Sequence, residues 1–157
     1  MGNIAQPDPV RLFLAIMYAP GVDLQAVLDR LSAAYGPVEQ SYGPVPFDYS
    51  DYYTREMGTA LRKHYLVFAP LMDRERLPEI KTSTNDLEQK YAREGKRTVN
   101  LDPGYLAHDK LVLATTKDFF HRLYLHDGIY AEVTVSYRQG RFRFFSWTYA
   151  DYRDPCL

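Results

Sequence analysis

The sequence predicts a single α+β domain with a mostly antiparallel, mixed sheet and two main helices. Three observations predict this fold class. The chain has 157 residues, of which 46% are apolar and 25% charged, as in an ordinary globular domain. Strand-like and helical segments alternate in the first half, whereas the second half alternates apolar and polar residues between turn signals. We therefore expect residues 1–157 to form one domain, in which a ferredoxin-like order fits the first half and a three-stranded meander follows.

The first two elements are the best defined. Residues 10–18 are a nearly continuous apolar run, which is typical of a central strand buried on both faces. Asp23 is a good N-cap for the helix that follows, because its side chain can accept a hydrogen bond from a free amide of the first turn. Apolar residues then recur at spacings of three and four from Leu24 to Tyr35, and Gly36-Pro37 ends the helix.

The middle of the chain predicts a short strand, a loop, a short surface helix, a strand and a second long helix. Their expected ranges are 38–42, 43–46, 48–57, 61–69 and 78–94. Pro78 suits the first turn of the second long helix and Gly95 suits its end, because proline needs no N–H donor there and glycine adopts a positive φ. Ile80, Leu87 and Tyr91 are expected to face the core.

Turn signals divide the rest of the chain. A short strand is expected over 97–101, and Asp102-Pro103-Gly104 predicts a turn, because proline presets φ and glycine accepts a positive φ. Residues 110–116 form another expected strand. Residues 121–147 then form the three-stranded meander, with turns at Asp127-Gly128 and Gln139-Gly140.

Two-residue turns would fix which side chains of the meander share a face. The core face would carry Ala131, Val133, Val135, Tyr137, Phe142 and Phe144. The polar face would carry His121, Glu132, Thr134, Arg143, Phe145 and Trp147. His121 and Glu132 would be diagonal neighbours there, and a carboxylate beside a histidine orients its ring for acid–base chemistry. We interpret His121 and Glu132 as candidate catalytic residues, with a simple ion pair on a solvated face as the alternative.

Six further residues are candidate ligand-binding residues, because cations and hydroxyls together suit phosphate or carboxylate recognition. Asn100 and Asp102 flank the expected turn and would orient a sugar hydroxyl or a cation. The other four lie near the meander in sequence: Lys110, Thr115, Lys117 and Arg122. This set predicts a site for an anionic small molecule or a nucleotide. The sequence assigns no cofactor, and its four histidines match no metal-binding pattern, so no metal site is predicted.

Two other function classes follow from other segments. The aromatic and acidic segment 47–53 is typical of a protein-binding surface, and self-association through it is an alternative. Arg138, Arg141 and Arg143 with Phe145 and Trp147 would suit single-stranded nucleic acid. The net charge of −1 and the pI near 6.4 disfavour a nucleic-acid partner.

Composition also indicates where the protein acts. The single cysteine, Cys156, cannot form an internal disulfide, so nothing points to secretion. The longest apolar stretch, residues 12–19, is too short to cross a bilayer, and the N-terminus lacks the apolar run of a signal peptide. We expect a cytoplasmic protein with no membrane partner. The sequence has no phosphate-binding P-loop, no dinucleotide fingerprint and no nucleophile elbow.

Several segments resemble one known family over nearly the whole chain. They include Phe47-Asp48-Tyr49-Ser50-Asp51-Tyr52-Tyr53, then Val99 to Tyr105, Lys110 to Asp118, Tyr130 to Thr134 and Trp147 to Arg153. Together they resemble the prokaryotic family catalogued as domain of unknown function 4416. Some members of that family are labelled GTP-binding proteins, but Thr116-Lys117-Asp118 here departs from the [NT]-K-x-D pattern that reads a guanine base. Beside the family the C-terminus looks short, so a final helix is expected to be missing or dispensable. The resemblance implies no reaction.

Overall fold

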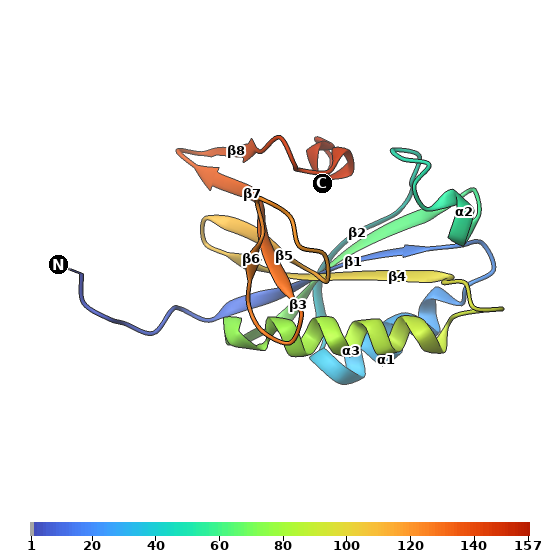
Figure 1. Ribbon diagram of the computed structural model, residues 1–157, viewed down its shortest axis with the longest axis horizontal. Coiled ribbons are helices and arrows are strands. Elements are labelled where there is room, and N and C mark those ends of the chain that lie inside the picture. The colour runs from blue at the N-terminus through green and yellow to red at the C-terminus, as the bar shows by residue number, and fades with distance from the viewer. Residues whose placement is uncertain (1) are drawn as a thin grey trace.

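The computed structural model describes residues 2–157, which fold as one α+β domain around an open sheet of eight strands (Figure 1). The helices are α1 (Leu24–Tyr35), the short α2 (Thr54–Met57) and α3 (Leu77–Lys90), with 3-10 turns η1 (Arg74–Arg76) and η2 (Ala150–Arg153). The strands are β1 (Val10–Tyr18), β2 (Val38–Pro46), β3 (Arg62–Met72), β4 (Val99–Ala107), β5 (Lys110–Thr115), β6 (Leu123–Tyr124), β7 (Tyr130–Arg138) and β8 (Arg141–Phe144).

The first half has the ferredoxin-like arrangement that the order of elements allows. Its strands lie in the order β2-β3-β1-β4, and each neighbouring pair is antiparallel. Both long helices lie on one face of the sheet, and the C-terminal segment lies on the other (Figure 1). This arrangement confirms the predicted fold class.

Strand β1 separates two cores, as its continuous apolar run predicts. Its even-numbered residues, such as Leu14 and Ile16, pack with α1 and α3. Its odd-numbered residues, such as Phe13 and Ala15, pack on the opposite face with residues of β3, β5 and η2. The cap of α1 is also as predicted, because the Asp23 side chain accepts a hydrogen bond from the Ala26 N–H at 3.2 Å.

The second half extends the sheet. β5 pairs with β4 on one side and with β7 on the other. β6 and β8 both pair with the remaining edge of β7, at opposite ends of that strand. Between them, the Trp147 Nε1 donates to the Val133 carbonyl at 2.9 Å and the Thr148 hydroxyl to the Thr134 carbonyl at 2.6 Å. β6, β7 and β8 follow one another in the chain and pair as expected, but β6 and β8 share one edge of β7, whereas a meander would place them on opposite edges.

Two segments predicted as loop or turn are strand. Residues 43–46 belong to β2, which pairs with β3 across a register shift between Tyr42 and Val45. Asp102-Pro103-Gly104 lies within β4. Gly104 serves close packing there, because a Cβ atom at this position would lie 2.2 Å from the Val112 carbonyl oxygen of β5. The helices at 54–57 and 77–90 are also shorter than predicted.

The predicted register of the meander is wrong at its first turn and right at its second. Asp127 and Gly128 both have positive φ, as the turn requires, but Leu123 faces Ala131 instead of Glu132. The shift by one residue follows from the hydrogen bond between the Leu125 N–H and the Ile129 carbonyl. After the second turn, Tyr137 faces Phe142 as predicted.

The predicted core face of the meander is also wrong. Leu111 faces Val135 but Val112 faces Val133, so Thr134 is an extra residue that forms a bulge in β7. Val133 and Val135 consequently pack into different cores on opposite faces of the sheet. Three of the residues expected in the core are exposed: Tyr137, Phe142 and Phe144.

Replacing Gly104 with alanine should destabilise the fold by about 3 kcal/mol, because the new methyl group meets the backbone of β5. Gly95→Ala is the matched control: its φ is +74° but its surroundings are open, so the expected loss is about 1 kcal/mol. Urea unfolding measures both. Equal losses would show that close packing at Gly104 has no special role.

His64 should make stability depend on pH. It is buried, neither of its ring nitrogens bonds to a residue of the range 2–157, and burial lowers the pKa of His64. The unfolded chain, with an ordinary histidine pKa near 6.5, therefore binds a proton first, and stability falls as pH drops below that value. His64→Leu should reduce the loss of unfolding free energy between about pH 7.5 and about pH 5, whereas the exposed His108→Leu should not.

Candidate functional site

The candidate site is a cleft where β4 and β5 separate. The β4–β5 ladder ends at the pair Gly104–Leu113. One residue further, Pro103 has no N–H to continue the pairing, and β4 stays with β1 while β5 stays with β7. A cleft of about 660 Å³ lies between them, lined also by α3, by residues 47–53 and by the C-terminal segment. This volume is typical of small-molecule sites.

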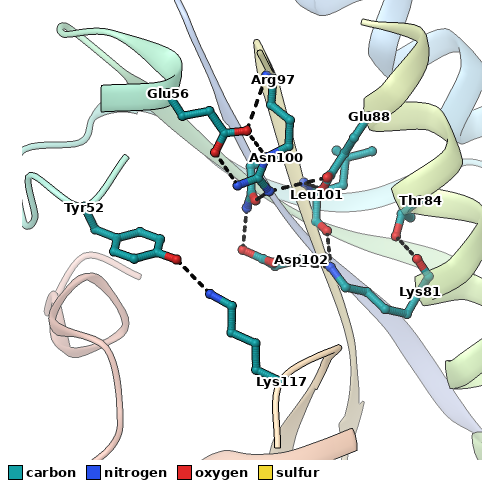
Figure 2. Close-up of polar contacts among 10 residues, drawn as sticks. All are labelled: Tyr52, Glu56, Lys81, Thr84, Glu88, Arg97, Asn100, Leu101, Asp102 and Lys117. Atoms are coloured by element: carbon teal, nitrogen blue, oxygen red, sulfur yellow. Dashed lines mark hydrogen bonds and ion pairs between the residues drawn. The ribbon is translucent and has the colours of Figure 1, made fainter. Parts of the chain in front are cut away.

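Two side chains of α3 bond to the backbone of β4 where β4 no longer pairs with β5. The Leu101 N–H donates to the Glu88 carboxylate at 2.6 Å, and the Leu101 carbonyl accepts from the Lys81 Nζ at 2.9 Å (Figure 2). Both side chains are buried. Burial raises the pKa of Glu88, and the bond from the Leu101 N–H opposes that rise. On this wall of the cleft, side chains of α3 therefore supply the hydrogen bonds that a neighbouring strand would otherwise make to β4.

Arg97 ties α2 to the same wall (Figure 2). Its Nε and one terminal nitrogen donate to the two oxygens of Glu56, both at 2.7 Å, and its other terminal nitrogen donates to Asn100 at 2.7 Å. This two-pronged contact lowers the pKa of Glu56. The Asn100 amide in turn donates to Asp102 at 2.7 Å. The carboxylate of Asp102 is thereby held at the cleft.

A buried ion pair forms the floor. The Lys63 ammonium contacts Asp151, which also accepts from the Tyr65 hydroxyl at 2.8 Å. Rings of Phe47, Tyr65 and Tyr152 lie 5.0–5.4 Å from the Lys63 nitrogen. Burial, with Asp151 beside it, raises the pKa of Tyr65 well above its ordinary value. Since Asp151 belongs to η2, this pair anchors the C-terminal segment to β3.

The predicted His121–Glu132 pair is in contact, with 3.0 Å between Nε2 and a carboxylate oxygen. Glu132 is buried and lines the cleft, and it also accepts from the Arg122 Nε at 2.8 Å. His121 is not among the residues that line the cleft. Its ring stacks on Trp147, with 4.9 Å between centroids. Glu132 is therefore the member of the pair that can meet a ligand, and His121 positions it.

The other predicted binding residues divide into two groups. Asn100, Asp102, Thr115, Lys117 and Arg122 all line the cleft, although they come from separate segments. Lys110 does not, because it lies at the far end of β5, beside the turn to β4, and pairs with Asp109.

Sequence reasoning missed several residues of the cleft. Lys63 and Asp151 are 88 positions apart, and no local pattern links them. A signal did exist on α3, where polar residues recur at spacings of three and four on a face that the apolar pattern leaves free. These residues are Lys81, Asn85 and Glu88.

The charges lining the cleft are mostly paired. Four of its five cations contact a carboxylate: Lys63, Lys81, Arg97 and Arg122. Within residues 2–157 the fifth, Lys117, contacts no carboxylate. Its Nζ donates to the Tyr52 hydroxyl at 2.8 Å (Figure 2), which lowers the pKa of Tyr52.

Fold and site together define the class of protein: a ferredoxin-like unit, extended by C-terminal strands, with a polar cleft where its sheet divides. Residues 8–157 match the family described as Domain of unknown function (DUF4416), and the chain belongs to that family. No curated protein and no solved structure gives a significant match. Over the described residues, no helix has both the length and the apolar character needed to cross a membrane.

The floor of the cleft can be tested with Lys63→Met, Asp151→Asn and the double variant. Lys63→Met should cost about 3 kcal/mol, because it leaves a buried carboxylate without its cation. The double variant should lose much less than the two single losses together. The more exposed pair Lys110–Asp109 is the control, with an expected coupling below about 1 kcal/mol. Additive losses at Lys63 and Asp151 in urea unfolding would contradict the pairing.

Proposed function

We propose that the protein binds a small anionic molecule in the cleft, and that Lys117 contacts the anion. The observation that carries the proposal is the pairing of charges around it. Every other cation lining the cleft is neutralised by a carboxylate, whereas the ammonium group of Lys117 bonds only to the Tyr52 phenol in the described part of the chain. An ammonium group has three donors, so two of those on Lys117 are free for a ligand.

Neighbouring groups support the same assignment. Arg122 is oriented by Glu132 and by the Lys117 carbonyl, and its remaining nitrogen makes only a long contact of 3.4 Å to the Tyr149 hydroxyl. Thr116 adds a hydroxyl to the lining. A lysine, an arginine with an available terminal guanidinium nitrogen and a hydroxyl are typical of phosphate or carboxylate sites.

The shape of the cleft favours a metabolite over a macromolecule. It has the volume of a small-molecule site, and the rings of Tyr49, Tyr52, Tyr53 and Tyr149 lie in its lining. Such rings pack against sugar or base rings. If the bound molecule reacts, Glu132 is the carboxylate placed to act as general acid or base, with His121 as the positioning residue.

The alternatives have weaker support. The aromatic residues of the segment 47–53 are partly used within the domain: Phe47 and Tyr53 pack against a buried core, and the exposed Tyr49 donates to Asp154 at 2.9 Å. Phe145 and Trp147 stack on each other, with 4.8 Å between ring centroids, so their facing surfaces are covered. Self-association and nucleic-acid binding stay predictions without a specific observation in their favour.

Lys117→Gln should weaken anion binding by at least about tenfold, because it removes the free charge and leaves a neutral polar side chain that is one bond shorter. The measurement is calorimetric titration at low ionic strength with inorganic phosphate, pyrophosphate, ribose 5-phosphate and succinate. Lys110→Gln is the matched control and should bind within about twofold of the wild type, because Lys110 lies outside the cleft.

Two results would contradict the proposal. One is that the wild-type protein binds none of these anions. The other is that Lys117→Gln binds the tightest of them as well as the wild type does.

A further inference from the structure

The carboxylates that line the cleft differ in their exposure and in how many contacts they accept from the protein. The side chains of Glu88, Glu132 and Asp151 are only 3–5% exposed, and each accepts at least two contacts from the protein. The side chain of Asp102 is 32% exposed. Asp102 is therefore the most exposed of the four carboxylates that line the cleft.

Asp102 also has acceptor capacity to spare. One of its oxygens accepts from the Asn100 amide at 2.7 Å. The other lies 3.5 Å from the Lys81 nitrogen, which is too long for a good hydrogen bond. A carboxylate offers about four lone-pair positions, so most of those on Asp102 are free. Figure 2 shows Asp102 between Lys81 and Asn100, on the wall that β4 and α3 form.

A second unused group lies on the same wall. Asn85 of α3 lines the cleft and is half-buried, yet its amide makes no hydrogen bond to any residue from 2 to 157. An amide both donates and accepts. Asp102 and Asn85 thus offer acceptors and a donor on one wall, while Lys117 follows β5 on the other wall.

We infer that the ligand is a phosphorylated sugar or nucleoside, whose hydroxyl groups bind Asp102 and Asn85 while its phosphate binds Lys117. This inference rests on the proposed function. A hydroxyl fits this wall because it can donate to Asp102 and accept from Asn85 at the same time. A ligand ammonium fits less well, because Lys81 already places a positive charge 3.5 Å from the same carboxylate.

The test compares three phosphates of similar length with different tails. Ribose 5-phosphate has hydroxyls, pentyl phosphate has none, and 5-aminopentyl phosphate has a terminal amine. Calorimetry on the wild-type protein should give an affinity for ribose 5-phosphate at least about tenfold above that for the other two. Equal affinities, or tighter binding of the amine, would overturn the inference.

Variants of Asp102 and Asn85 test whether this wall binds the hydroxyl groups of the ligand. Asp102→Asn should weaken ribose 5-phosphate by about tenfold relative to pentyl phosphate, because the carboxylate acceptor is lost; the ratio of the two affinities is the readout, since the variant also leaves Lys81 without its carboxylate. Asn85→Leu should act in the same direction, and it removes no hydrogen bond within the described chain, so folding is not at risk through one. Asp109→Asn, outside the cleft, is the control and should change neither affinity.

The outcomes also distinguish the inference from the proposed function. If Lys117→Gln weakens both ribose 5-phosphate and pentyl phosphate but the Asp102 and Asn85 variants do not discriminate between them, the anion site stands and the sugar inference is wrong. If binding that depends on Lys117 is confined to probes without hydroxyls, the inference is also wrong. If Lys117→Gln changes neither affinity, the proposed function itself fails.

Discussion

Between Gly104 and Leu113 the backbones of β4 and β5 lie so close that no side chain fits between them, and at Pro103, the residue before Gly104, the pairing stops. Glycine allows the close approach and proline withholds the N–H that would extend it. The two halves of the sheet therefore meet at one short ladder and diverge beyond it. The cleft, and the edge of β4 that no strand pairs with, both follow from this local constraint.

Beyond Pro103, β4 no longer pairs with β5, and its backbone N–H and C=O groups on that side are buried. Leaving them without hydrogen-bond partners would destabilise the fold. Lys81 and Glu88 solve this by bonding to the carbonyl and N–H of Leu101. Arg97 and Asn100 extend the network to Asp102, and Lys63 with Asp151 closes the floor. Because most charged groups are already paired, the few unpaired groups of the cleft are the ones that the proposed ligand would contact.

The elements defined by one dominant pattern were predictable. The continuous apolar run of β1 and the cap and spacing of α1 each have one reading, and the structure confirms them. Asp102-Pro103-Gly104 has two readings, since the residues that make a turn also permit close strand packing and the end of a ladder. Which of the two forms depends on whether β5 packs beside these residues, and no local sequence pattern shows that.

The candidate site was predictable where its residues cluster in sequence and not where they come from distant segments. His121 and Glu132 do touch, although the register that predicted their contact is off by one residue. The contact is instead part of a cluster in which Arg122 also binds Glu132. Lys63 and Asp151 meet only after the whole sheet has formed, so their pairing lies beyond any local reading.

The shared edge of β7 has a consequence for solubility. A long free edge can pair with the edge of another molecule and start aggregation. Here β6 and β8 occupy the two ends of that edge, and Trp147 and Thr148 bond to the carbonyls between them. At the opposite side of the sheet, β2 carries Pro44 and Pro46, which offer no N–H to a neighbour. Both margins of the sheet thus resist edge-to-edge pairing with a strand of another molecule.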